Sequence, residues 1–592
     1  MDKTLQSFEY ELDALKRSLE EFETKHPQKA KSLGVSAGKC LDPNIQRLSD
    51  SFAFLAARLS SQIDENHPKM ALDLLRMISP LMLLGAPTYC SFALAYKDNK
   101  LEGKQNIKKG QEITVPVSEN FNCTYSVAQD TNIHPIEITA LSLDVAPFGF
   151  DIPNCNIAVK SSVSFEVTSL DLDQEVSELD LEELEFYLPM HSARRSYLWK
   201  AFTSDIVSVS IGKPSEYPLY WLSPNTFECL ALGSQNNFLP SVTPLENGTE
   251  YLRDFLSYPE KFAFFVLRGL KEAISKIDGS CFQIRFYLST KNIEPLINIE
   301  LGDVKINVLG CINYFQRTSV PTQYSFARDR VPVFPTKNDS KEPVEVLSII
   351  DLIQLTPKGD VELKEMHSPL RKDSDKTPVW QEHLVVGNLD PLRREVSFSV
   401  PSMLTGPGDS IDFNAKMLCS NGHAASAPRP GNQAFLTIEE ADAILFFVLD
   451  EPTKQIEPDF AAARQWDLMS VITSSLSTFF DSPEPVQWLK KIFNLCSPSG
   501  YSEDANAIWD VTIQRSIAPL RIGNGTILAT GNKVEIIIVS DALSCVPVVF
   551  AHVLNSFLSN LVSYDRFLQL TLRERGSNLV LIKLPRTHGS QA

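Results

Sequence analysis

The sequence lacks the motifs that mark most enzymes and metal-binding proteins. It contains no phosphate-binding loop, no Gly-x-Gly-x-x-Gly after a strand, no Gly-x-Ser-x-Gly elbow and no helix with paired histidines. Its ten cysteines include no Cys-x-x-Cys pair, so they indicate reduced, buried thiols and neither a zinc site nor a disulfide framework. These absences predict a protein with no catalytic residues, no cofactor and no metal.

Signals for a membrane or for nucleic acid are missing as well. No apolar run approaches the roughly 18 to 20 residues that cross a bilayer, and the first residues lack the basic and apolar regions of a signal peptide. Acidic residues outnumber basic ones by 73 to 55, which gives a net charge of −18. This balance argues against a nucleic-acid binder and against direct membrane insertion, because both need positive patches. We expect a cytoplasmic protein.

The N-terminal segment from Lys3 to about His26 carries an apolar seam. Its members recur at strict 3-4-3-4-3 spacing and are Leu5, Phe8, Leu12, Leu15, Leu19 and Phe22. Such spacing places them at the a and d positions of three heptads, which predicts a helix with a coiled-coil-like contact. Pro27 is expected to end this helix.

A second helix is predicted to begin at Asp42, because Asp can cap the first turn and Pro43 fits the first helical position. Residues at steps of three and four form a stripe, namely Ile45, Leu48, Phe52, Leu55 and Leu59. The segment 52–57 is apolar all round, so this part must be covered on every side. After Pro68 a third helix is predicted, which ends before Pro80.

The rest of the chain alternates or is rich in branched and aromatic residues from about Thr88, which predicts mostly sheet. Two helical interruptions are expected, at LEELEFYLPMHSARRSYLWKAF and at YPEKFAFFVLRGL. The last third is predicted to be mixed, with strands, three helical segments and a final hairpin that turns at Gly576 and Ser577. We therefore predict an α+β multidomain protein with a helical bundle segment at 1–85, a β-rich middle domain at 86–342 and a mixed α/β domain at 343–592.

Three local patterns resemble functional sites. Acids in Asp171–Glu182 have calcium-loop spacing, but Val176 stands where the turn needs glycine, so a solvated acidic face is the simpler interpretation. Cys419 and His423 are close enough for a thiolate pair, yet no orienting group or oxyanion site is evident. Residues 523–526, Gly-Asn-Gly-Thr, precede a strand rather than a helix and predict a plain turn.

The order of several blocks resembles the TssF family, a baseplate wedge subunit of the bacterial type VI secretion system related to wedge proteins of contractile phage tails. The N-terminal blocks that carry the resemblance are YELDALKRSLEEFETKHPQKAKSLG, DPNIQRLSDSFAFLAARLSSQID and LLRMISPLMLLGAP. Later blocks in the same order are YPEKFAFFVLRGL, INYFQRTSVP, LCSNG, WDLMSVITSSLS and VFAHVLNSFLSNLVSYDRFLQLTL. The resemblance therefore extends over the whole chain.

This resemblance implies a structural function without enzymatic activity. In the family, two TssF copies join one TssG in a wedge through an intersubunit helical bundle, and TssK links wedges to the membrane complex. The expected partners of this chain are therefore a TssG-like subunit, a second copy of itself, a TssK-like adaptor, TssE and sheath proteins, and a VgrG-like spike hub. The platform formed would be cytoplasmic, docked at the inner membrane, and would support sheath and tube assembly around the spike.

The resemblance also implies what covers the N-terminal helices. The expected intersubunit positions are the seam and the stripe described above, together with Phe54 and Arg58. Three alternatives remain open at this stage. The helices could form a self-contained domain that packs on its own sheet; the chain could belong to a phage tail or another contractile injection particle; or it could be a cytosolic hydrolase that uses Cys419.

Overall fold

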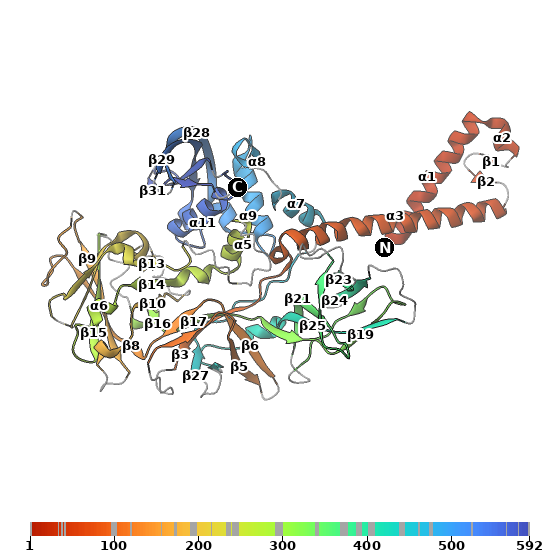
Figure 1. Ribbon diagram of the computed structural model, residues 1–592. Helices are drawn as coiled ribbons and strands as arrows, with labels where there is room; N and C mark the ends of the chain where they lie inside the picture. The colour runs from red at the N-terminus through yellow and green to blue at the C-terminus, as the bar shows by residue number, and fades with distance from the viewer. Residues whose placement is uncertain are drawn as a thin grey trace. The chain divides into compact units, whose positions relative to one another are not determined.

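The helices and strands of the computed structural model fall into two units (Figure 1). The first unit contains Met1–Ile78 and Phe460–Val471, and the second contains Ser79–Asp459 and Ile472–Ala592. The residues that the structure describes are 3–32, 35–36, 39–40, 43–95, 103–118, 121–155, 157–170, 175–189, 198–199, 201–214, 216–232, 238, 248–289, 300–337, 343–366, 377–385, 393–400, 409–436, 444–459, 462–472, 477–522, 525–563, 565–577 and 579–589.

Two long helices dominate the first unit. Helix α1 spans Lys3–Lys25, which confirms the helix predicted from the heptad seam. The chain then forms α2 (Pro27–Ser32) and the antiparallel strands β1 (Val35–Ser36) and β2 (Lys39–Cys40). Strand β1 contacts α1 and strand β2 contacts α3, so this small hairpin lies between the two helices (Figure 1). Helix α7 (Ala462–Ile472) supplies the second segment of the unit.

Helix α3 is continuous over Pro43–Ile78. The prediction of two helices separated before Pro68 is therefore wrong. Proline has no amide to donate to the carbonyl of Asp64, so one intrahelical hydrogen bond is lost at this point. The turns on either side keep their own bonds, and a long helix can continue through a single proline.

A closed six-stranded barrel is part of the second unit (Figure 1). Its strands, in order around the barrel, are β17 (Val308–Ile312), β3 (Tyr89–Leu94), β27 (Ile444–Val448), β26 (Gln433–Leu436), β5 (Glu112–Ser118) and β6 (Phe121–Val127). Branched and aromatic side chains fill the interior, among them Phe92, Tyr125 and Phe446. The barrel therefore joins segments that are more than 300 positions apart in the sequence.

Two further sheets pack against each other through aromatic rings. One has the order β12 (Tyr220–Leu222), β11 (Ile206–Gly212), β15 (Cys281–Leu288), β9 (Ser161–Ser169) and β8 (Ile136–Val145). The other has the order β13 (Phe227–Cys229), β14 (Phe264–Arg268), β10 (Glu183–Tyr187) and β16 (Lys305–Ile306). Phe286 of the first sheet contacts Phe186 and Phe227 of the second, with ring centroids 6.2 and 4.9 Å apart.

Each helical interruption expected in this region contains a strand. The end of the first block is helical as predicted, at Leu198–Trp199 and in a π-helical turn at Ala201–Asp205, while residues 190–197 and 200 lie outside the described part of the chain. Residues Glu183–Tyr187 form β10 and residues Phe264–Arg268 form β14, and these two strands pair with each other in antiparallel register. A short apolar run fits a buried strand as well as a buried helix, so the periodicity alone could not separate them. The helical part of the second block is limited to a 3₁₀ turn at Pro259–Ala263.

An eight-stranded sheet follows. Its order is β18 (Phe315–Thr318), β25 (Ser410–Ser420), β21 (Glu345–Gln354), β22 (Val361–Glu365), β23 (Val379–Val385), β24 (Arg393–Ser399) and β20 (Val331–Pro332), with β19 (Thr322–Ser325) also paired to β25. Strands that precede residue 342 thus pair with strands that follow it. The three-domain division itself stays a prediction.

The C-terminal sheet confirms the predicted final hairpin. Its strands are β28 (Ile508–Ile522), β29 (Gly525–Ile538), β30 (Phe567–Glu574), β31 (Val580–Lys583) and β32 (Thr587–His588). Strands β30 and β31 are antiparallel, and Gly576 between them has a positive φ of 84°. The α-helices described in this unit include α5 (Gly248–Ser257), α6 (Lys271–Ile274), α8 (Ser477–Phe480), α9 (Pro485–Cys496), α10 (Asp504–Ala507) and α11 (Pro547–Ser559), of which α11 packs on β30.

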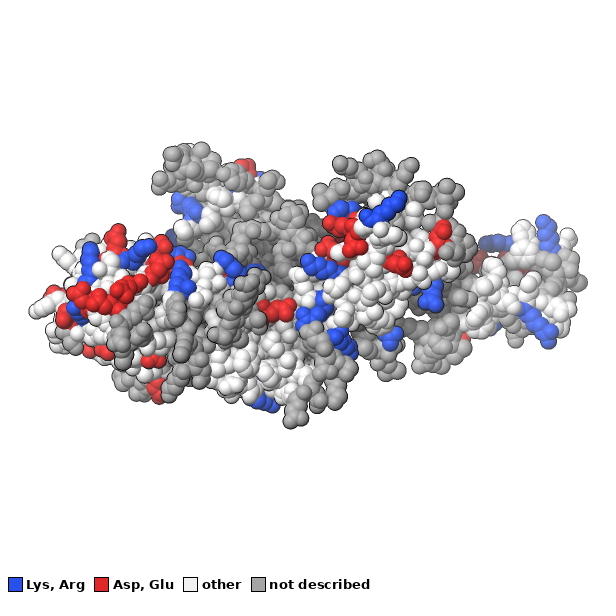
Figure 2. Space-filling model, turned by 60° about the horizontal axis from the view of Figure 1, so that its bottom comes forward, with Lys and Arg blue, Asp and Glu red and all other residues white. Residues whose placement is uncertain are grey.

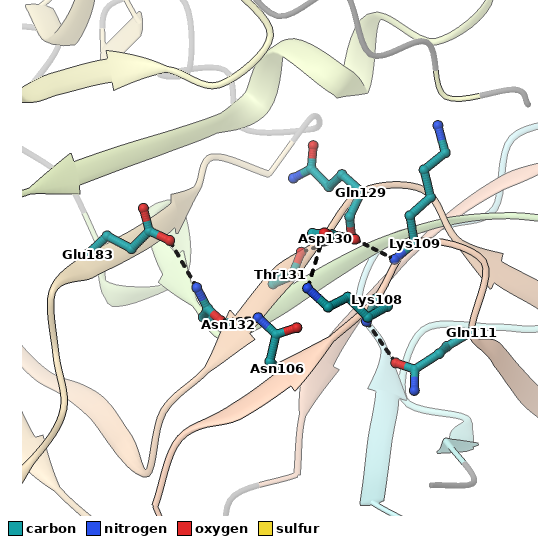
Figure 3. A network of polar contacts seen from close by, with 9 residues as sticks. All are labelled: Asn106, Lys108, Lys109, Gln111, Gln129, Asp130, Thr131, Asn132 and Glu183. Carbon is teal, nitrogen blue, oxygen red and sulfur yellow. Dashed lines mark hydrogen bonds and ion pairs between the residues drawn. The ribbon is translucent and has the colours of Figure 1, made fainter. Parts of the chain in front are cut away.

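A polar network links the two-stranded sheet of β4 (Gln105–Ile107) and β7 (Thr131–Ile133) to strand β10 (Figure 3). Asn106 Nδ2 donates to Asn132 Oδ1 at 2.8 Å, and Asn132 Nδ2 donates to Glu183 Oε1 at 2.9 Å.

Taken together, these elements form a strand-rich mixed α and β protein that includes a barrel. Over the described ranges, no helix is long and apolar enough to span a membrane.

Candidate functional site

Helix α1 uses its predicted seam within the first unit. Phe8, Leu12, Leu15, Leu19 and Phe22 are all half-buried. The Phe8 ring meets the Phe54 ring of α3 edge to face, with centroids 6.3 Å apart. Other residues of the same chain therefore cover part of the seam. The heptad spacing predicted a contact between helices but did not identify the helix that makes it.

Helix α3 has two apolar faces, and the chain covers one of them. Successive residues of an α-helix rotate by about 100° around its axis. Ala53 and Ala57 therefore lie about 140° to 180° from Leu48, and both are fully buried. Since α1 packs on this part of α3 through Phe8, the two small alanines allow the helices to approach closely.

The opposite face of α3 is apolar and exposed. Leu48, Phe52, Leu55 and Leu59 fall within about 60° of one another around the helix. Their exposed fractions are 72%, 63%, 55% and 60%. We call these four residues the α3 stripe. A soluble protein seldom exposes a continuous row of large apolar side chains without a partner for it.

The structure describes most of the predicted interface residues. The seam residues are half-buried, the α3 stripe is exposed, and Phe54 is 51% exposed at the edge of the α1 contact. Leu5, Ile45 and Arg58 belong to α1 and α3, but their side chains lie outside the part that the structure describes. The predicted set therefore divides into a face used inside the chain and a face left open.

Met70 was missed by the sequence reasoning. It lies on α3, is 59% exposed, and falls about 40° from Leu48 around the helix, on the same side as the α3 stripe. The assumed helix break before Pro68 hid this relation. If Pro43–Ile78 is treated as one helix, the spacing from Leu59 onward places Met70 on the same side as the α3 stripe.

A family model described as "Type VI secretion system, TssF" matches residues 1–591. The chain belongs to the TssF family. This match confirms the resemblance found from the N-terminal and later sequence blocks. The covered face and the exposed face of helix α3 can therefore be compared with what is expected of a TssF-family protein.

A curated relative with the same family name is the type VI secretion system component TssF1 of Pseudomonas aeruginosa. It is 22% identical over 291 residues, which are 47% of this chain and 46% of that relative. The aligned segment thus spans about half the length of the curated relative.

Two solved structures have a similar fold. A chain in the cryo-electron microscopy structure of the type VI secretion system TssK-TssF-TssG baseplate subcomplex gives a TM-score of 0.71 at 18% identity, covering 92% of this chain and 99% of that chain. A chain in the baseplate complex from the type VI secretion system gives 0.60 at 18% identity, covering 99% and 100%. These likenesses show the fold.

The acidic run behaves as the predicted solvated face where it is described. Glu178, Asp180 and Glu182 are exposed, whereas Leu179 and Leu181 between them are buried. Acidic and basic side chains lie next to one another on the face drawn in Figure 2. Within the described part of the chain, no group of three or more histidine, cysteine or acidic side chains could hold a metal ion.

The other two local patterns also have structural explanations. Cys419 is fully buried in the core of the eight-stranded sheet, while the His423 ring is exposed and its Nε2 lies 3.0 Å from Glu457. Gly525 and Thr526 begin β29 and pair with Ile522 and Arg521 of β28. Gly523 and Asn524, the other two residues of the predicted turn, lie outside the described residues.

Proposed function

We propose that this TssF-family chain is a structural component of a type VI secretion baseplate and assembles with a TssG-like subunit and a TssK-like adaptor. Two findings support the proposal: the family match over residues 1–591 and the fold shared with a chain of the TssK-TssF-TssG subcomplex. The exposed α3 stripe is the observation that carries it, because an assembly protein needs such a surface.

The proposed arrangement follows the family. Two copies of the chain would join one TssG-like subunit in a wedge, and the TssK-like adaptor would connect the wedge to the membrane complex at the cytoplasmic side. The wedges would then form the platform on which sheath and tube assemble around a VgrG-like spike, with TssE and sheath proteins as neighbours. In this arrangement the chain positions other proteins and has no catalytic function.

The α3 stripe has enough exposed surface to affect assembly. The exposed fractions of its four residues add up to about two and a half side chains. Full burial of one such side chain is worth about 1.5 to 3 kcal/mol, so covering the stripe would contribute about 4 to 7 kcal/mol. Association itself costs an estimated 4 kcal/mol or more, so the stripe needs the rest of an interface but is a major part of it.

The proposal is tested by co-expressing the chain with a TssG-like protein. We expect the wild-type proteins to elute together, and we expect Leu55→Asp to abolish co-elution, because a carboxylate would be buried against a partner helix. Leu55 is 55% exposed in the single chain, so the substitution leaves the chain's own packing largely unchanged.

The matched control is Ser18→Asp, which adds the same charge at an exposed position of α1. This variant should co-elute as the wild type does, and both variants should show the wild-type melting temperature in isolation. Co-elution of Leu55→Asp at the wild-type yield would show that the α3 stripe is not the interface.

A further inference from the structure

A cavity of about 980 Å³ lies in the second unit between the β28–β29 hairpin, the end of α8 and the segment that follows α11 (Figure 1). Sites that bind small molecules commonly have volumes of about 300 to 1,000 Å³. Asn532 and Val562, which are 8% and 0% exposed, form the floor of this cavity. Exposed residues, among them Arg515, Ile517 and Arg566, form its rim.

One face of the hairpin leads from solvent into the cavity. In the antiparallel register of the two strands, Arg515 lies opposite Asn532. Ile517 lies opposite Thr530. Opposed residues share a face of the sheet, and so do residues two positions apart, so these four side chains lie on one face. Ile517 is 71% exposed and Asn532 is 8% exposed, so this face has an apolar rim and a polar, buried floor.

The side-chain amide of Asn532 is the first sign of a ligand. Among the residues that the structure describes, none forms a hydrogen bond with this amide. Its oxygen and nitrogen are not fully enclosed by protein, so a molecule in the cavity has access to them. A buried amide without a partner is costly, and a ligand that bonds to it removes that cost.

The charged groups of the rim are a second and independent sign. Arg515 pairs with Asp481 at 2.5 Å. The guanidinium group of Arg566 has no acidic partner within the described part of the chain. Two arginines and one aspartate are the charged residues among the described lining, so the cavity has an excess positive charge in a chain whose net charge is −18. Such a cavity attracts anions.

The shape of the unpaired group narrows the kind of anion. A guanidinium group presents two parallel N–H donors that match the two oxygens of a carboxylate. Phe480, which is half-buried, and Ile517 add apolar surface to the walls. A carboxylate attached to an apolar body therefore fits the lining better than a small inorganic anion, which would leave those walls uncovered.

We propose that this cavity binds a carboxylate group attached to an apolar body. The Arg566 guanidinium pairs with the carboxylate, the Asn532 amide donates a hydrogen bond to the ligand from the floor, and the apolar body packs against Phe480 and Ile517. The carboxylate belongs either to a free organic acid or to an aspartate or glutamate side chain of another protein.

The probe for this proposal is 3-phenylpropionate, which joins a carboxylate to an apolar ring. Saturation-transfer NMR titration of the full chain should show saturable binding of this acid and no binding of the neutral analogue 3-phenylpropan-1-ol. Arg566→Gln should weaken binding of the acid at least about tenfold, the effect of losing a hydrogen bond to a charged group.

Asn532→Leu is the second variant, and it has a distinctive expected result. It should weaken binding of 3-phenylpropionate about fivefold, the effect of one neutral hydrogen bond. Without the probe its melting temperature should equal or exceed that of the wild type, because the amide has no partner to lose among the described residues. Arg328→Gln, which removes an exposed arginine outside the cavity, should leave binding unchanged.

Three results would overturn the proposal: no saturable binding of 3-phenylpropionate to the wild type, equal binding of the alcohol, or unchanged binding in both Arg566→Gln and Asn532→Leu. A final titration distinguishes the two sources of the carboxylate. Binding that disappears in the complex with the TssG-like and TssK-like proteins identifies a partner side chain as the occupant, and binding that persists identifies a free organic acid. This last step alone rests on the proposed function.

Discussion

A buried ion pair in the second unit gives a sharp prediction about stability. Lys261 Nζ lies 2.7 Å from Asp254 Oδ2 of α5, and the two side chains are only 3% and 5% exposed. The rings of Phe238 and Tyr251 each lie 5.5 Å from the same Nζ. Lys261→Met keeps the length and apolar contacts of the side chain but leaves the Asp254 carboxylate without this cation.

The expected loss can be worked out from the geometry. Two unit charges 2.7 Å apart interact with about 6 kcal/mol at an effective dielectric constant of about 20. The variant no longer buries an ammonium group, so the net cost is smaller, and removal of one partner of a buried pair costs about 3 to 5 kcal/mol. The Phe238 amide still donates to Asp254 at 3.3 Å. Burial lowers the pKa of Lys109, and Asp254 lies close enough to oppose part of that lowering. We therefore expect Lys261→Met to lower the free energy of unfolding by about 3 kcal/mol. Urea unfolding at pH 7 measures this loss of unfolding free energy.

Lys271→Met is the matched control, because Lys271 forms a pair of 3.3 Å with Asp180 in which both side chains are mostly exposed. The control should lose no more than about 0.5 kcal/mol of unfolding free energy. A loss below about 1 kcal/mol of unfolding free energy for Lys261→Met at pH 7 would refute the reasoning that this pair is energetically important.

Two further predictions concern single positions. Burial raises the pKa of Glu185 from its ordinary value of 4.5 to about 8, so this carboxyl lowers the stability of the fold as pH rises from about 4.5 to about 8; Glu185→Gln should therefore be more stable than the wild type at pH 8.5 and close to it at pH 5, as measured by thermal unfolding. A Cβ at Gly531 would lie 2.2 Å from the carbonyl oxygen of Phe567 on the neighbouring strand, so Gly531→Ala should cost about 1 to 3 kcal/mol in urea unfolding, and a neutral effect would contradict that contact.

The sequence predicted elements with a strong period and misread short or interrupted ones. Helix α1 was predicted because a heptad seam cannot fit a strand. Strands β10 and β14 lie in blocks that the sequence predicts to be helical, because a short apolar run has no decisive period, and their pairing with each other becomes visible only in the structure. The continuity of α3 was missed because a proline is usually a boundary.

The candidate site was predictable in part. Spacing alone identified Leu48, Phe52, Leu55 and Leu59 as one stripe. It could not say which face of α3 is covered by α1, because Ala53 and Ala57 are apolar too. Only their full burial and the contact of Phe8 with Phe54 show that the alanine face is used within the chain and that the stripe is left open.

The most direct test of the central claim is the mass of the complex formed with the TssG-like neighbour, measured by light scattering during size-exclusion chromatography. The proposed assembly predicts a single species with two copies of this chain and one TssG-like subunit. A chain that elutes alone as a stable monomer, at its own mass of 66.2 kDa, in the presence of the neighbour would contradict it.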